Sequence, residues 1–107
     1  MLYELRVYDV MPGKLPALND RFAKITLPYF EKYGIKVVGF WTDVIGRTNQ
    51  LTYMLAYDDM AHREKAWSAF QADRDRLREF EETERNGLLV ARVTNSLMRP
   101  TAYSPMQ

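Results

Sequence analysis

Two segments of this chain, 35–44 and 50–57, have the composition of β-strands but lack polar residues at every second position. In the earlier segment, alternation places Val37, Gly39 and Trp41 on one face and Val38 and Phe40 on the other. In the later segment, Leu51, Tyr53, Leu55 and Tyr57 oppose Met54 and Ala56. A sheet that meets water on one side alternates apolar and polar residues. Both faces of this sheet are therefore predicted to be covered.

Two further strands and three helices are predicted around these segments. Residues 2–10 alternate with a period of two, so that Tyr3, Leu5 and Val7 face one way and Glu4, Arg6 and Tyr8 the other. A first helix carries apolar residues three or four apart (Leu15, Leu18, Phe22, Ile25 and Tyr29), with Pro28 expected to kink or split it and Gly34 to cap its end. The last strand spans residues 88–98.

The second helical region is predicted to be broken in two by its capping residues. Asp58 or Asp59 can cap a helix that starts near Met60, with Trp67 and Phe70 on its buried side. Asp73 can cap another that runs to about residue 84, with Leu77 and Phe80 as its apolar contacts. The order β-α-β-β-α-β predicts a single α+β domain over 1–107, with a ferredoxin-like four-stranded antiparallel sheet and helices on one face.

The second face of that sheet requires a partner, because the helices cover only one. Four strands of this length present roughly 500 Å², and monomers rarely expose apolar patches of that size. Covering the face contributes on the order of 10 kcal/mol per protomer, against an association cost of about 4 to 15 kcal/mol. Two sheets packed face to face about a two-fold axis satisfy both copies, so we expect a homodimer.

Composition narrows the classes of function. The chain has no cysteine, which excludes disulfides and thiolate chemistry. The net charge is +1 with both signs interspersed, so no nucleic-acid partner is expected. No apolar run reaches the roughly 20 residues that span a bilayer, and no leader precedes the first strand, so we expect a cytoplasmic protein without membrane insertion.

His62, the single histidine, is the first candidate catalytic residue. It falls in the first turn of a predicted helix, where the dipole favours a neutral imidazole able to act as a base. Arg63 beside it could orient an anionic ligand. The alternative is a histidine that packs or caps locally. No metal site is expected, because no carboxylate lies four residues further along the same face.

Glu4, Arg6 and Tyr8 share one face of the first strand, and two charges at the centre of a sheet are costly unless paired. They form either a structural ion-pair network that reaches Arg92 or Arg99, or a polar cluster in a ligand cavity. In the second case Arg6 would hold a carboxylate, Glu4 would serve as acid or base, and Tyr8 and Arg99 would contact the ligand.

Aromatic residues supply a second set of ligand-binding candidates. Trp41, Tyr53, Tyr57 and Trp67 could line a pocket for a flat apolar molecule. The alternative is that they fill the core, which is the commoner role of aromatic residues on strands and helices.

Nine short motifs run nearly the whole length of the chain in a characteristic order, at residues 3–8, 12–15, 32–41, 45–46, 49–50, 56–58, 61–64, 97–101 and 103–105. Together they resemble the NIPSNAP family. That resemblance implies the dimeric α/β-barrel superfamily, in which two ferredoxin-like sheets pack into a barrel, and it implies no particular reaction. Relatives of the barrel include cofactor-free monooxygenases, lactone isomerases and haem-degrading enzymes, but a shared fold is a poor guide to chemistry.

Three functions remain open from the sequence. The first is a NIPSNAP-like homodimer without a cofactor that binds a small molecule or a protein partner. The second is a cofactor-independent monooxygenase or isomerase for a small aromatic or polyketide-like substrate, in which His62 or Glu4 removes a proton and Arg6 steadies the oxyanion. The third is a haem binder that uses His62.

The oligomeric state is the most direct test of the apolar-face argument. Sedimentation at micromolar concentration is expected to give a species of twice 12.6 kDa. A single species near 12.6 kDa would contradict the argument.

Overall fold

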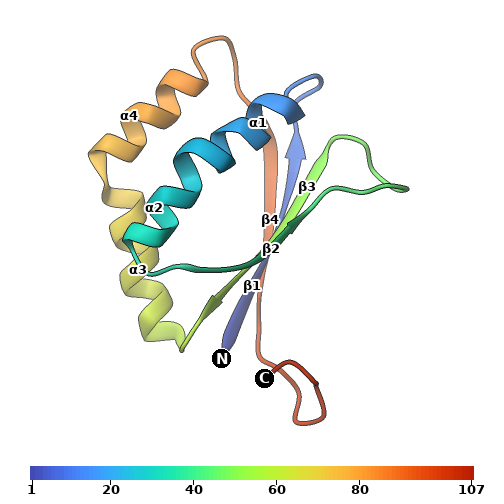
Figure 1. The fold of residues 1–107 in the computed structure, drawn as a ribbon, viewed down its shortest axis with the longest axis vertical. Helices are drawn as coiled ribbons and strands as arrows, with labels where there is room; N and C mark the ends of the chain where they lie inside the picture. The colour runs from blue at the N-terminus through green and yellow to red at the C-terminus, as the bar shows by residue number, and fades with distance from the viewer.

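The computed structural model describes residues 1–107 as a four-stranded antiparallel sheet with all helices on one face (Figure 1). The strands are β1 (Leu2–Val10), β2 (Lys36–Trp41), β3 (Gln50–Tyr57) and β4 (Val90–Met98). Their spatial order is β2-β3-β1-β4, so β1 lies between β3 and β4. The α+β class and the ferredoxin-like arrangement predicted from the sequence are confirmed.

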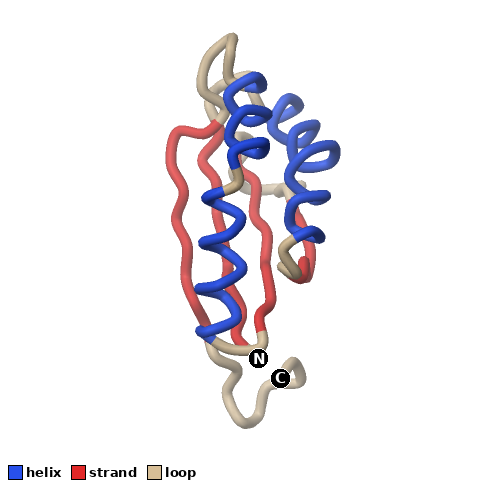
Figure 2. Tube along the Cα trace, turned by 90° about the vertical axis from the view of Figure 1, so that its left-hand side faces the viewer, coloured by secondary structure: helices blue, strands red, loops and turns tan.

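Five helical segments form the second layer, which lies in front of the sheet in Figure 2. They are α1 (Leu15–Arg21), the π-helix η1 (Phe22–Thr26), α2 (Leu27–Lys32), α3 (Met60–Ala72) and α4 (Arg74–Thr83). None of them is long and apolar enough to cross a membrane.

The first helical run, residues 15–32, is continuous but widens in its middle. At Leu27 the backbone N–H donates to the carbonyl of Phe22, five residues earlier, which is the π-helical pattern. A proline cannot donate to the carbonyl four residues before it, and its ring clashes with that group. For Pro28 that residue is Lys24, which lies inside η1. Instead of the kink or split predicted at Pro28, the helix has a π turn just before the proline and continues through it.

A bulge in β2 changes the register against β3. Val37 pairs with Leu55, but the next residue of β3, Met54, pairs with Gly39. Two residues of β2 therefore oppose one residue of β3, which leaves Val38 unpaired in a β-bulge.

The bulge corrects the predicted faces of β2. Val37 and Phe40 both pack against the core on the helix side. Gly39 and Trp41 lie on the opposite face, where the Trp41 ring covers the glycine: a Cβ at residue 39 would be 2.8 Å from the indole. The prediction that Val37, Gly39 and Trp41 share a face is wrong, because one inserted residue reverses the alternation.

The predicted strand over 35–44 is also too long. β2 ends at Trp41, and residues 42–44 belong to the loop that leads to β3. Val44 and Ile45 in this loop are almost fully exposed, at 99% and 95%.

The core lies between the sheet and the helices. β3 contributes four buried residues, Leu51, Tyr53, Leu55 and Tyr57. The helices contribute Leu18, Phe22, Phe30, Ala66 and Phe70.

Asp73 separates α3 from α4 and sets the rotation of α4. Its backbone is extended, and its carboxylate accepts a hydrogen bond of 3.1 Å from the N–H of Arg76. The inward face of α4 then carries Arg76, 8% exposed, and Phe80, which packs against the core. The predicted apolar contact of Leu77 is wrong, because that side chain is 42% exposed.

Two leucine-to-alanine substitutions test this core. Leu55→Ala removes a side chain with no exposed surface, so it is expected to lower the free energy of unfolding by about 2–5 kcal/mol. Leu77→Ala, on the exposed side of α4, is expected to change it by no more than about 0.5 kcal/mol. Urea unfolding followed by circular dichroism measures both, and equal losses would contradict the assigned core.

Candidate functional site

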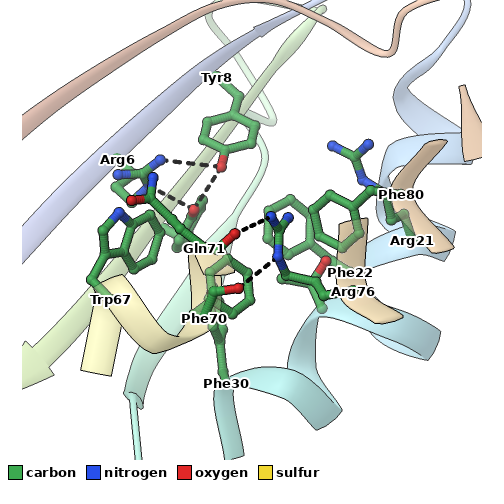
Figure 3. A pocket seen from close by; sticks show the side chains of 12 residues that line it. Arg6, Tyr8, Arg21, Phe22, Phe30, Trp67, Phe70, Gln71, Arg76 and Phe80 are labelled. Atoms are coloured by element: carbon green, nitrogen blue, oxygen red, sulfur yellow. Dashed lines mark hydrogen bonds between the residues drawn. The ribbon is translucent and has the colours of Figure 1, made fainter. Parts of the chain in front are cut away.

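A cavity of about 170 Å³ lies between the helices and the sheet (Figure 3). Most of its wall is aromatic, from Tyr8, Phe22, Phe30, Tyr53, Trp67, Phe70 and Phe80. Five polar residues complete it: Arg6, Arg21, Thr26, Gln71 and Arg76. An apolar wall with a few converging polar groups is typical of a small-molecule site.

The sheet side of the cavity carries a hydrogen-bonded cluster of Arg6, Tyr8 and Tyr53. Arg6 Nε donates to the Tyr53 hydroxyl at 2.7 Å, and its Nη2 to the Tyr8 hydroxyl at 3.5 Å. The two hydroxyl oxygens are 2.8 Å apart. Burial raises the pKa of Tyr53 well above its ordinary value, so it is a neutral phenol at pH 7.

One of the two hydroxyl protons of Tyr8 and Tyr53 has no acceptor within this cluster. The bond between their oxygens uses one of the two hydroxyl protons, and Arg6 supplies donors only. The other hydroxyl proton is therefore available to a ligand in the cavity. The predicted cluster of Arg6 and Tyr8 is thus found at the cavity wall, together with Tyr53.

Glu4 lies next to this cluster but does not line the cavity. Its fully buried carboxylate accepts from Arg63 at 3.0 and 3.2 Å, from Arg6 at 2.9 Å and from Asn95 at 2.9 Å. Burial raises its pKa, but the hydrogen bonds from Arg63 and Asn95 and the charge of Arg6 outweigh burial, and the pKa is lowered overall. Glu4 therefore holds Arg6 in place as a carboxylate.

The predicted partners of this network, Arg92 and Arg99, are not part of it. Arg92 pairs with Asp9 at 3.4 Å, on the face of the sheet away from the helices. Arg99 follows β4 and lies near the C-terminal segment and the start of β1, outside the cavity. The partner is Arg63 instead, because α3 crosses the sheet above Glu4.

His62 is also outside the cavity. Its backbone N–H donates to the Asp59 carboxylate at 2.8 Å, and its Nδ1 accepts from the N–H of Asp58 at 2.9 Å. Nε2 is 3.2 Å from the carbonyl of Gly34. The neutral tautomer with its proton on Nε2 satisfies both ring nitrogens, so the imidazole links the start of α3 to the end of α2.

The other aromatic candidates are dispersed. Trp41 lies on the open face of the sheet, 51% exposed. Tyr57 is buried beside Glu4 and its hydroxyl has no partner; burial, with the nearby charge of Glu4, raises its pKa. Tyr53 and Trp67 do line the cavity. No three acidic or histidine side chains converge in a way that could hold a metal ion.

The helix side of the cavity holds residues that the sequence analysis missed, Arg21, Thr26 and Arg76. Arg21 and Arg76 both lie against the Phe80 ring, with their guanidinium carbons 4.5 and 4.6 Å from its centroid. The sequence did contain a signal for the two arginines, because each has the spacing of an apolar helix face. Arg21 is three residues after Leu18, and Arg76 is four residues before Phe80.

The structure thus defines a class of protein: a ferredoxin-like α+β domain with an aromatic, arginine-bearing cavity between its two layers. The NIPSNAP family profile matches residues 3–105, and the chain belongs to the NIPSNAP family.

Solved structures agree in fold. Protein Atu4242 from Agrobacterium tumefaciens has a TM-score of 0.85 at 24% identity, with 100% of each chain covered. A NIPSNAP domain protein from Burkholderia xenovorans has a TM-score of 0.84 at 25% identity, covering 98% of this chain and 99% of the other. PA3566 from Pseudomonas aeruginosa is more distant, with a TM-score of 0.67 at 18% identity over 94% of each chain. No curated protein matches the sequence.

Glu4→Gln tests the network beside the cavity. The substitution leaves two partly buried arginines, Arg6 and Arg63, without their carboxylate, so the expected loss of unfolding free energy at pH 7 is about 3–5 kcal/mol. The folded-state pKa of Glu4 lies below its ordinary value of 4.5. The stability that the ionised Glu4 carboxylate gives the fold is therefore fully present above pH 4.5 and is lost as the pH falls through the folded-state pKa. The difference between variant and wild type should therefore shrink in acid.

The control for this variant is Asp9→Asn on the same strand, which removes an ion pair with an exposed arginine. Its cost is expected to be at most about 1 kcal/mol. Denaturant unfolding at several pH values measures both variants, and a Glu4→Gln loss that does not depend on pH would be the contrary result.

Proposed function

We propose that this protein is a homodimeric NIPSNAP domain that binds a small planar organic molecule in the cavity between its helices and its sheet. The observation that supports this most strongly is the wall itself, which combines aromatic rings with the polar side chains of Arg6, Gln71 and Arg76. Seven aromatic and five polar residues line the cavity, and a mostly apolar wall with a few polar groups is typical of a ligand pocket.

The size of the cavity suits one ring of a ligand. An engineered apolar cavity of about 150 Å³ is large enough for benzene, and this one measures about 170 Å³. Pockets for drug-sized ligands are larger, at roughly 300–1,000 Å³. A single six-membered ring with one or two short polar substituents fits this volume.

The open face of the sheet supports the homodimer. Figure 1 shows no helix on that side, and the central strands present there Leu5, Val7, Thr52 and Met54, which are half-buried. Tyr3 and Ala56 share this face but are already buried within the chain. Polar residues lie toward the edge, in β4 and at the Asp9–Arg92 pair. An apolar centre with a polar rim is the usual anatomy of an interface. A reducing compartment such as the cytoplasm suits a chain without cysteine.

Neither alternative gains support from the site geometry. A cofactor-independent oxygenase or isomerase would need a base in the cavity, and the two residues proposed for that role, His62 and Glu4, do not line it. For the haem binder, both His62 ring nitrogens are engaged by backbone groups, so neither is free to ligate iron.

A pair of tryptophan substitutions on α3 tests binding in the cavity. Gln71 lines the cavity with an exposed side chain, so Gln71→Trp is expected to obstruct it without disturbing the core. Ser68→Trp places the same bulk on an exposed position of α3 that does not line the cavity. With benzoate, benzyl alcohol and benzamide as probes, Gln71→Trp should weaken whichever probes bind by about tenfold or more, and Ser68→Trp should not.

Ligand-observed NMR with each probe measures the affinities, and native mass spectrometry of protein purified from its host reports any retained molecule with the oligomeric mass. The proposal fails if none of the three probes binds the wild type, or if both tryptophan variants weaken binding equally.

A further inference from the structure

We infer that the ligand of this cavity carries an oxygen acceptor, such as the carbonyl of an aromatic ketone, and that the Tyr8 hydroxyl binds this oxygen as a donor. This inference rests on the proposed function, which makes the cavity a ligand site. It adds the chemical class of the ligand and the residue that selects it. Figure 3 shows the Tyr8 side chain extending from the sheet into the space between the two layers, with a hydrogen bond from Arg6 to its hydroxyl.

Burial determines how the two hydroxyl protons of the tyrosine pair are arranged. Tyr53 is 0% exposed, and its oxygen already accepts from Arg6 Nε at 2.7 Å. The acceptor within hydrogen-bonding distance of its own proton is the Tyr8 oxygen, at 2.8 Å. If Tyr8 donated to Tyr53 instead, the Tyr53 proton would be buried without an acceptor, which native proteins nearly always avoid. Tyr53 therefore donates to Tyr8.

Tyr8 is left with a proton that no protein group accepts. Its oxygen accepts from Tyr53 at 2.8 Å and from Arg6 Nη2 at 3.5 Å, and both neighbours act as donors to it. Tyr8 lines the cavity and, unlike Tyr53, is only half-buried. The free proton thus belongs to the accessible member of the pair, at the end of a chain that runs from Arg6 through Tyr53 to Tyr8.

This chain strengthens the Tyr8 hydroxyl as a donor. Consecutive hydrogen bonds polarise one another, so a hydroxyl that accepts a bond donates a stronger one. The chain begins at the guanidinium of Arg6, which is permanently charged. The Glu4 carboxylate holds that guanidinium at 2.9 Å, and the Trp67 ring lies against it, with its centroid 4.6 Å from the guanidinium carbon. The donor is therefore both polarised and fixed in position.

The wall around Tyr8 favours a ligand that accepts a hydrogen bond. Apart from the tyrosines, its polar side chains are those of three arginines, one threonine and one glutamine, so it contains no carboxylate. The carboxylate bonded to this cluster, that of Glu4, is occupied by Arg6, Arg63 and Asn95. A carbonyl oxygen would take the Tyr8 proton, whereas a group without an acceptor would leave that proton unpaired in apolar surroundings.

The aromatic rings next to Tyr8 determine the remainder of the ligand. The centroid of the Tyr8 ring is 5.7 Å from that of Phe22 and 5.3 Å from that of Tyr53. Phe30 continues this wall, 6.4 Å from Tyr53. A planar ring inserted among them extends the same packing. The ligand class is therefore a one-ring aromatic ketone, aldehyde or amide, with its oxygen at Tyr8 and its ring against the phenylalanines.

Two probes of the same shape test the hydrogen bond. Acetophenone and α-methylstyrene share the ring and the branch, but the first ends in a carbonyl oxygen and the second in a methylene group. Tyr8→Phe removes the donor and keeps the aromatic ring. It is expected to weaken acetophenone by about tenfold and to leave α-methylstyrene unchanged or more tightly bound. Titrations followed by ligand-observed NMR measure both affinities.

Tyr57→Phe is the matched control, because Tyr57 is a buried tyrosine of β3 whose hydroxyl has no partner and which does not line the cavity. It should leave both affinities unchanged. The inference is overturned if Tyr8→Phe weakens the two probes equally or weakens neither, and ring binding then stands because the wild type binds both. If neither probe binds the wild type, the proposed ring-binding function falls with the inference.

Infrared spectroscopy of the wild-type protein supplies a measurement that does not depend on how a variant folds. A carbonyl that accepts from a polarised hydroxyl vibrates at a lower frequency, so the carbonyl band of bound acetophenone is expected below its position in hexane. Tyr57→Phe should keep this displacement of the band, and Tyr8→Phe should lose it. A bound carbonyl that absorbs as it does in hexane would overturn the inference, as would a displaced band that Tyr8→Phe retains.

Discussion

A single buried carboxylate, Glu4, connects three parts of this structure. It lies on the central strand β1 with no exposed surface and accepts from α3 through Arg63, from its own strand through Arg6 and from β4 through Asn95. A buried charge is tolerated only when its partners are held in good geometry. The docking of α3 on the sheet and the orientation of Arg6 at the cavity wall therefore depend on the same group.

The cavity exists because the helical layer is interrupted in two places. The π turn η1 brings Phe22 and Thr26 to the cavity, and the break at Asp73 lets α4 turn Arg76 inward. Each interruption has a local cause, a proline in one case and a capping aspartate in the other. Local deviations from regular helices frequently accompany functional sites, and here both deviations place polar groups next to aromatic rings.

The sequence was sufficient for the order of the elements, the central place of β1 and the cluster of Arg6 with Tyr8, because period-two and helical patterns report which face a residue occupies. It was insufficient where one residue shifts the pattern. The bulge at Val38 reversed the faces of β2. The one signal for it was Gly39 beside it, since a glycine inside a strand often marks a bulge. The rotation of α4 was missed for a different reason, although its cap at Asp73 was predicted. Leu77 and Phe80 have the spacing of one apolar face, whereas the inward face carries Arg76 with Phe80.

The cavity itself could not be predicted, because it depends on how two layers are spaced. Arg21 and Arg76 were visible as cations on apolar helix faces, but long side chains in such places often extend to water. Only the packed structure distinguishes a guanidinium that reaches solvent from one that stays inside.

The contact between Gly39 and Trp41 has a consequence for the other members of the family. The indole occupies the space that any side chain at residue 39 would need, since a Cβ there would lie 2.8 Å from the ring. Relatives with a larger residue at the position equivalent to 39 must move or shorten the aromatic two residues later. The two positions should therefore vary together, and the shape of the open face of the sheet should change with them.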